Sequence, residues 1–105
     1  MNSKPEYSKQ DVLNQVCEML GIGPYHVGSG SSEPAAFFRE VAEALGIQLS
    51  DGLSKPEVAE EIVRRAGLEW DKECDSRSSA SGGGSTVTLT GLRRVSQAVR
   101  VLLTK

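Results

Sequence analysis

The sequence predicts a small, mainly helical domain with one β-hairpin, in the winged-helix-like order of three helices, a hairpin and a last helix. Three observations predict this fold class. Four segments carry apolar residues at helical spacing, three of them end in the same apolar-glycine-apolar pattern, and one segment near residue 87 alternates threonine with apolar residues. The length of 105 residues fits one domain. We expect that domain over residues 8–105, after a tail of residues 1–7.

Capping signals indicate where the first three helices begin. Ser8 and Asp11 have the spacing of a capping box for the first helix. The second helix is expected to begin around Ser32, with Pro34 in its first turn, where proline is tolerated. A second capping box, in the sequence SKPE at residues 54–57, opens the third helix.

The same signal ends each of these helices. Gly21, Gly46 and Gly67 each follow an apolar helical residue and precede another apolar residue. Glycine adopts the left-handed conformation just past a helix, and the apolar residue after it packs back on the last turn. We therefore predict a positive φ at all three glycines.

Beyond the third helix the pattern changes to that of strands. Residues 68–70 and 86–90 alternate in polarity, and the second run is rich in threonine. Between them lies a serine- and glycine-rich stretch, which predicts a mobile hairpin tip at about residues 75–85. Thr90 is then expected to cap a last helix. Its apolar stripe is formed by Leu92, Val95, Val99, Leu102 and Leu103.

Charge is distributed unevenly along the chain. The net charge is −2, and residues 1–50 hold three basic and six acidic side chains. After Ser76 the sequence has five basic residues and no acid. Such a segment favours a polyanionic partner. Alternatively, it forms a basic face that balances acidic helices within the fold, and the sequence leaves both interpretations open.

No catalytic constellation is evident. His26 is the single histidine and stands in a loop without a serine elbow or a neighbouring carboxylate. Cys17 belongs to an apolar helical stripe, and Glu73 and Asp75 flank Cys74, which raises a thiol pKa. The spacing of these residues fits no metal site. We expect no enzyme activity in this chain, no catalytic or metal-ligating residues and no cofactor.

The sequence also lacks membrane and export signals. No apolar run approaches the ~18 residues that predict a membrane span. The first ten residues, MNSKPEYSKQ, do not resemble a signal peptide. We therefore expect a cytoplasmic protein with reduced thiols and no membrane partner.

Two regions are candidates for binding anions. Ser29 and Ser31 lead into the start of the second helix, where free backbone N–H groups can hold a phosphate. The alternative for these serines is an ordinary capped connection. The other region combines the hairpin with the first turn of the last helix. Its candidate DNA-binding residues are Ser76, Arg77, Ser79, Thr86, Thr88, Arg93 and Arg94.

The third helix is a poor candidate for contacting DNA. Its outer positions carry Glu57, Glu60 and Glu61, which phosphates would repel. Arg64 and Arg65 stand four residues after Glu60 and Glu61, the spacing of ordinary solvent-exposed ion pairs.

Three segments carry a resemblance to a known family. The sequences GSGSSEPAAFFREVAEALGI, GLSKPEVAEEIVRRAG and DSR…GSTVTLTGLRRV resemble an accessory module of bacterial restriction-type and HNH-type endonucleases. In that family the module accompanies a nuclease domain and helps to engage DNA. The family pattern places Ser-Arg-Gly close to the Thr-Val-Thr strand, whereas residues 78–83 separate Arg77 from Gly84 here. No nuclease carboxylate cluster or HNH histidine pair is present, so the resemblance implies that cutting belongs to another part of the protein.

The sequence therefore predicts a non-catalytic domain that binds double-stranded DNA, as the N-terminal part of a restriction-type or other DNA-processing protein. The alternative is a module for protein–protein interaction or dimerisation. An attached nuclease domain or a second copy of the chain is the expected protein partner.

Overall fold

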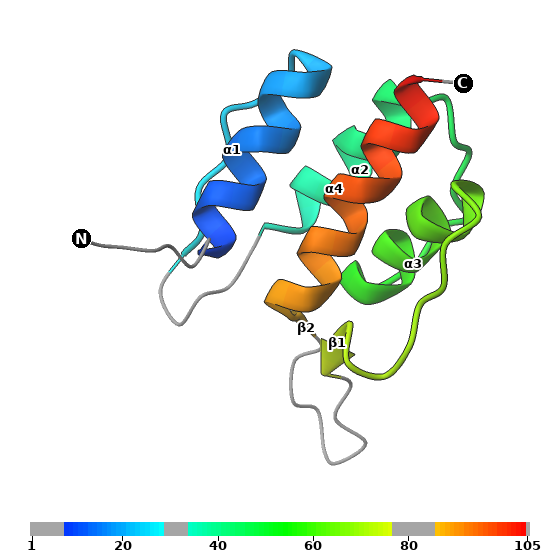
Figure 1. Ribbon diagram of the computed structural model, residues 1–105. Coiled ribbons are helices and arrows are strands. Elements are labelled where there is room, and N and C mark those ends of the chain that lie inside the picture. The colour runs from blue at the N-terminus through cyan, green and yellow to red at the C-terminus, as the bar shows by residue number, and fades with distance from the viewer. Residues whose placement is uncertain (1–7, 29–33, 77–85, 105) are drawn as a thin grey trace.

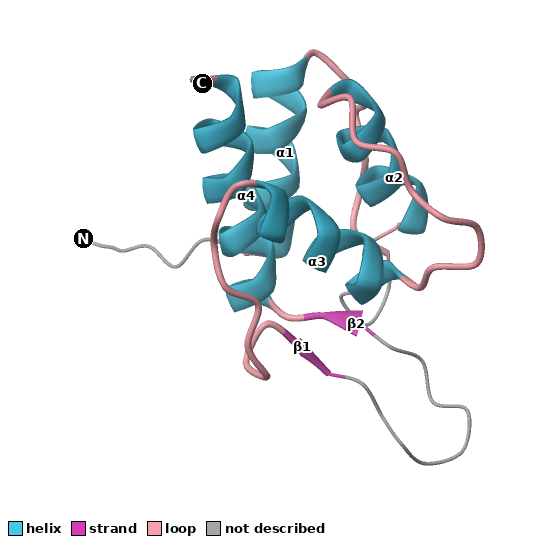
Figure 2. Ribbon diagram, turned by 90° about the vertical axis from the view of Figure 1, so that its right-hand side faces the viewer, coloured by secondary structure: helices cyan, strands magenta, loops and turns pink. Residues whose placement is uncertain are grey.

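The computed structural model describes residues 8–28, 34–76 and 86–104, and most of this part of the chain is helical. The helices are α1 (Lys9–Leu20), α2 (Ala35–Ala44), α3 (Lys55–Arg65) and α4 (Leu89–Leu103). α1 and α4 pack side by side and run in the same direction, with α2 behind them (Figure 1). α3 lies across this group and packs on α2 and α4 (Figure 2).

One aliphatic and aromatic core joins all four of these helices. Leu13, Phe37, Ile62 and Leu92, one from each helix, are fully buried. The phenyl rings of Phe37 and Phe38 meet edge to face, with centroids 5.1 Å apart. The predicted apolar stripes thus face inward, and Leu103, which is 49% exposed, is the exception among them. None of the helices in the described ranges is both long and apolar enough to cross a membrane.

The three predicted helix ends are confirmed. Gly21, Gly46 and Gly67 have φ values of 69°, 76° and 80°. In each case the N–H of the next residue returns to a carbonyl in the last helical turn. These bonds run from Ile22 to Cys17 (3.0 Å), from Ile47 to Ala42 (2.9 Å) and from Leu68 to Val63 (3.1 Å). The same short motif therefore ends three helices and directs an apolar residue back to the core.

The predicted capping boxes at Ser8 and Ser54 are both present. Two other predicted helix starts are wrong. α2 begins at Ala35 rather than around Ser32, since Pro34 is extended (ψ 138°) and serves as the N-cap. α4 begins at Leu89, because the Thr88 side chain, not that of Thr90, accepts a hydrogen bond from a helical N–H, that of Gly91.

The predicted winged-helix-like fold with a β-hairpin is wrong. The described residues form a mainly helical domain, and their extended pairing is limited to two residues on each side, β1 (Asp75–Ser76) and β2 (Thr86–Val87). Residues 68–70 form no strand, and Leu89 and Thr90 belong to α4. Among the described residues the pairing is too short to make a hairpin wing. On the side of α4, capping by Thr88 ends the extended segment and starts the helix. The predicted mobile tip lies mostly outside the described residues, as does the tail of residues 1–7.

Side chains from both helices hold residues 25–27 of the connection from α1 to α2. The Gln10 amide donates to the Tyr25 carbonyl (3.0 Å) and accepts from the Val27 N–H (2.8 Å), as a neighbouring strand would. The Tyr25 hydroxyl donates to the Glu40 carboxylate on α2. This hydrogen bond raises the pKa of the Tyr25 phenol, because losing the proton would place two negative charges together.

A close backbone contact joins the start of α4 to the segment before β1. A Cβ atom on Gly91 would stand 2.1 Å from the Cys74 carbonyl oxygen and 2.8 Å from Cγ1 of Val87. Only glycine fits there. The contact fixes where the chain approaches α4 and is reinforced by a hydrogen bond from the Thr88 N–H to the Cys74 carbonyl (2.9 Å).

Replacement of Gly91 by alanine is expected to lower the free energy of unfolding by about 1–3 kcal/mol, the range for overpacking a close contact. Urea denaturation of both proteins measures this difference. A loss below about 0.5 kcal/mol would contradict the contact.

Gly46→Ala is the matched control for this substitution. The Gly46 φ of 76° makes alanine strained, but no atom lies within 4 Å of the added Cβ. The expected loss is therefore about 1 kcal/mol, the left-handed penalty alone, and Gly91→Ala should exceed it.

Candidate nucleic-acid interface

Five of the nine predicted DNA-binding residues lie in the part of the chain that the structure describes. Ser29, Ser31, Arg77 and Ser79 lie outside the described residues. The backbones of Ser76 and Thr86 pair in the two-residue ladder between β1 and β2. The remaining candidates, Thr88, Arg93 and Arg94, lie at and just beyond the start of α4.

Thr88 has a structural role. Its hydroxyl oxygen accepts from the Gly91 N–H (3.1 Å), and the same hydroxyl donates to the Glu73 carbonyl (2.6 Å). These two bonds cap α4 and attach the preceding segment to it. Both hydrogen-bonding directions of the hydroxyl are thus used within the protein, which removes Thr88 as a phosphate donor.

Arg93 and Arg94 lie in the second turn of α4, not in the first turn as predicted, because the helix begins at Leu89. Cations there oppose the helix dipole less than cations in the first turn would. Adjacent helical residues point about 100° apart, and the two arginines have different surroundings. Arg93 is exposed, whereas Arg94 turns toward residues 69–71.

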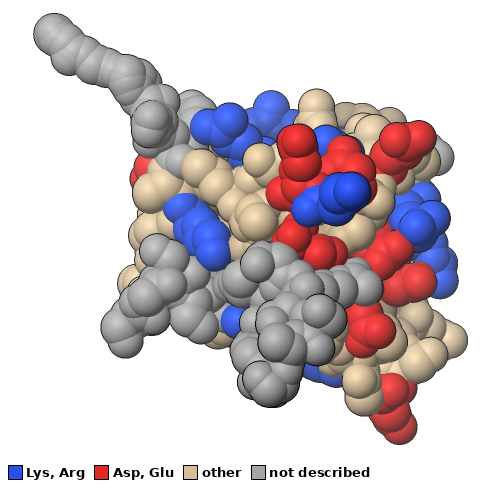
Figure 3. All heavy atoms as spheres, turned by 90° about the horizontal axis from the view of Figure 1, so that it is seen from below, with Lys and Arg blue, Asp and Glu red and all other residues tan. Residues whose placement is uncertain are grey.

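Arg94 is bound by the segment that follows α3. Its Nη1 donates to the Glu69 carbonyl (2.5 Å), and its Nη2 lies 3.6 Å from Oδ2 of Asp71. Four carboxylates, Glu69, Asp71, Glu73 and Asp75, lie in this short segment. Viewed from below, acidic and basic side chains are intermixed on this end of the molecule (Figure 3). Arg94 therefore belongs to an internal charge network.

Asp71 organises that segment. Its Oδ1 accepts from the Glu73 N–H (3.0 Å) and lies 3.5 Å from the Cys74 sulfur. The hydrogen bond from Glu73 lowers the pKa of the Asp71 carboxyl, and the nearby Arg94 adds to this effect. Asp71 therefore keeps its charge at neutral pH, and the contact with Arg94 remains ionic.

Neither cysteine has the character of a nucleophile. Both are free and buried, and burial raises the pKa of both thiols. For Cys74 the predicted rise in pKa is confirmed, but its main cause is burial rather than the flanking carboxylates.

A hollow of about 580 Å³ lies at the end of α1. Its lining residues are Asn14, Cys17, Glu18, Gly21, Ile22, Gly23 and Pro24.

The described residues hold no other cluster that suggests chemistry. His26 is exposed in the connection between α1 and α2. Within residues 8–28, 34–76 and 86–104, no group of three His, Cys, Asp or Glu side chains is placed to hold a metal ion. Within the described part of the chain, the surface of α4 is therefore the remaining candidate.

The outer face of α4 carries a row of exposed hydrogen-bond donors. Thr90, Arg93, Gln97 and Arg100 are all exposed and are spaced three, four and three residues apart. That spacing places them on one helical face. We call this row the donor stripe. The whole of α4 contains no acidic residue, and two of the four stripe residues, Arg93 and Arg100, are basic.

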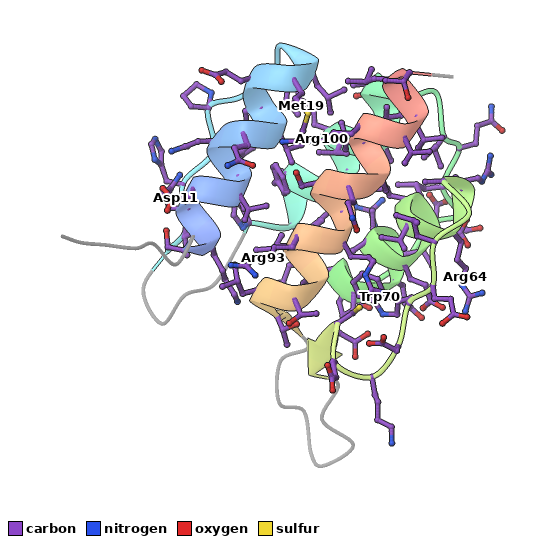
Figure 4. All side chains as sticks on the ribbon, viewed as in Figure 1. Asp11, Met19, Arg64, Trp70, Arg93 and Arg100 are labelled. Atoms are coloured by element: carbon purple, nitrogen blue, oxygen red, sulfur yellow. The ribbon has the colours of Figure 1, made fainter. Side chains whose placement is uncertain are left out.

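The donor stripe lies on the side of α4 toward α1. Figure 4 shows Arg93 and Arg100 on this side, with Met19 of α1 near Arg100. Asp11 points to the far side of α1 (Figure 4). Glu18 is seven residues after Asp11 and shares its helical face. The acidic face of α1 thus points away from the stripe.

The acidic residues of α3 also lie apart from the donor stripe. Arg64, which marks the outer face of α3, is on the opposite side of the molecule (Figure 4). The predicted ion pairs are confirmed: Arg64 lies 2.7 Å from Glu60, and Arg65 lies 4.0 Å from Glu61. This face is a neutralised surface.

Sequence reasoning missed Thr90, Gln97 and Arg100. The signal was available, because helical spacing from Arg93 selects Gln97 and Arg100 on the same face. The prediction instead followed the neighbouring pair Arg93 and Arg94, which point in different directions.

Comparison of the chain with protein-family models, with curated proteins and with solved structures finds no match.

Replacement of Thr88 by alanine is expected to lower the free energy of unfolding by about 1 kcal/mol, because it removes the N-cap of α4. Thr88→Ser keeps the hydroxyl and should retain most of that stability. Urea denaturation of the two variants gives the comparison. Unchanged stability with weakened DNA binding would instead make Thr88 a ligand contact.

Proposed function

We propose that this chain is a non-catalytic domain that binds duplex DNA through the donor stripe of α4. The observation that carries the proposal is the stripe itself, four exposed donors on one helical face without a carboxylate on the helix. Arginine, glutamine and threonine are residue types that contact phosphate oxygens in DNA complexes.

The dimensions of the stripe favour contact with the DNA backbone. Arg93 and Arg100 are seven residues apart, which corresponds to about 10 Å along the helix axis. Two long side chains at that separation can contact different phosphates, and Gln97 lies between them. Phosphate contacts position a duplex without reading its sequence. We therefore propose binding that depends little on base sequence.

The positions of the carboxylates on α3 and α1 support the same orientation. Glu60 and Glu61 lie on α3, and Asp11 and Glu18 lie on the outer face of α1. A duplex approaching the α4 side avoids both groups. The net charge of −2 is compatible with this approach, because the local field near a surface depends on nearby charges more than on distant ones.

The biological setting is part of the proposal. The resemblance to accessory modules of restriction-type and HNH-type endonucleases supports a role beside a nuclease domain, and we place this role in the cytoplasm. The rival function is a protein-interaction or dimerisation module. The two differ in their response to salt, since phosphate contacts release counterions and an apolar interface does not.

The double variant Arg93→Gln and Arg100→Gln is expected to weaken binding to any duplex and to lower the slope of log affinity against log salt by about two, one for each lost contact. Fluorescence anisotropy with a labelled duplex, titrated at several salt concentrations, measures both quantities. Two duplexes of unrelated sequence should give the same result.

The matched control is Arg64→Gln with Arg65→Gln, which removes the same charge from α3. Its affinity and salt slope should stay close to those of the parent chain. If the two double variants lose equal affinity for DNA, the loss reflects the overall charge of the chain and not the donor stripe. Unchanged binding in the α4 variant, with its helical circular dichroism intact, would remove the stripe as the DNA surface.

A further inference from the structure

Arg94 borders the donor stripe but does not belong to it. It stands four residues after Thr90 and three before Gln97, so its Cα lies beside both on the helix surface. An arginine that projects outward from this position would widen the positive face. Its side chain is instead 25% exposed and contacts the segment that follows α3.

The two contacts of Arg94 differ in kind. Nη1 donates to the Glu69 carbonyl at 2.5 Å, while Nη2 is paired with Oδ2 of Asp71 at 3.6 Å. The carbonyl contact belongs to the backbone and stays with any side chain at position 69. The ionic contact depends on Asp71 alone, so a single substitution can remove it.

The two oxygens of Asp71 serve different partners. Oδ1 accepts from the Glu73 N–H and lies near the Cys74 sulfur, whereas Oδ2 faces Arg94. Asparagine at this position can keep an oxygen toward Glu73 and place its NH₂ group toward the guanidinium. Asp71→Asn therefore removes the ion pair while leaving the acceptor that shapes the segment.

We propose that Asp71 is an autoinhibitory residue that holds Arg94 away from DNA and thereby limits the positive surface of α4 to the donor stripe. This inference rests on the proposed function. Loss of the ion pair leaves Arg94 on the Glu69 carbonyl, a neutral acceptor that a charged phosphate oxygen can replace. Arg94 would then add a phosphate contact beside Arg93. Any process that neutralises Asp71 or draws its segment away would then strengthen DNA binding.

The test compares Asp71→Asn with Glu61→Gln in the full chain. The two acidic side chains are 48% and 45% exposed, and their arginine partners lie at 3.6 Å and 4.0 Å. Each variant removes one negative charge, but only Asp71 borders the stripe. Asp71→Asn should raise the affinity at low salt and steepen the salt slope by about one, so that its gain over the parent chain is about threefold larger at roughly 50 mM than at roughly 200 mM salt. Glu61→Gln should change neither by more than the general charge effect.

A third variant tests whether the gain in DNA affinity depends on Arg94. Combining Asp71→Asn with Arg94→Gln should abolish the gain, and thermal unfolding followed by circular dichroism verifies that each variant is folded. If the parent chain binds duplex DNA with salt dependence but Asp71→Asn and Glu61→Gln behave alike, the autoinhibitory role is wrong and the proposed function stands. If the parent chain shows no salt-dependent binding, both fall.

Discussion

The approach of Gly91 to the Cys74 carbonyl is the contact on which the surface of α4 depends. Because no side chain separates the two backbones, the segment before β1 lies directly against the first turn of the helix. The Thr88 N–H bonds the same carbonyl, and the Thr88 hydroxyl bonds that of Glu73. The segment that carries Asp71 is thus fixed beside α4, within reach of Arg94.

This placement assigns different roles to two adjacent arginines. Arg94 faces the fixed segment and is partly neutralised there, while Arg93 points to the side shared with α1. The positive surface of the domain is therefore set by helix geometry and by one packed segment. The number of basic residues near the C-terminus does not show where this positive surface lies.

Helix ends were predictable from the sequence because their signals are local. A capping serine with its acidic partner, or a glycine between two apolar residues, acts within one turn and needs no distant contact. The start of α4 was harder. The alternating sequence TVTLT fits a strand as well as a capped helix start. The choice depends on Thr88, whose hydroxyl also donates a hydrogen bond to the carbonyl of Glu73, distant in sequence. Such a contact carries no local signal.

The candidate site was only partly predictable for a related reason. Sequence reasoning found the acid-free segment after Ser76 and the ion pairs of α3, because both follow from charge and spacing. It also grouped Thr88, Arg93 and Arg94 by proximity in sequence. Thr88 is used in capping and Arg94 is bound by a segment from beyond α3, and neither fact can be read from neighbouring residues.

The narrowness of the donor stripe bears on the role of the domain. Each phosphate contact contributes a factor of about three to the loss of affinity between roughly 50 and 200 mM salt, and a protein that makes about six to ten such contacts loses roughly 10³–10⁵ in affinity over that range. Two arginines supply far fewer, so the stripe alone would hold a duplex weakly. Weak contacts become effective when they are joined to a second binding surface, since the linked site then sees a high effective concentration of DNA. The proposed interface, which is narrow, independent of base sequence and restrained by Asp71, would therefore suit a domain that assists an attached DNA-processing domain better than one that binds DNA by itself.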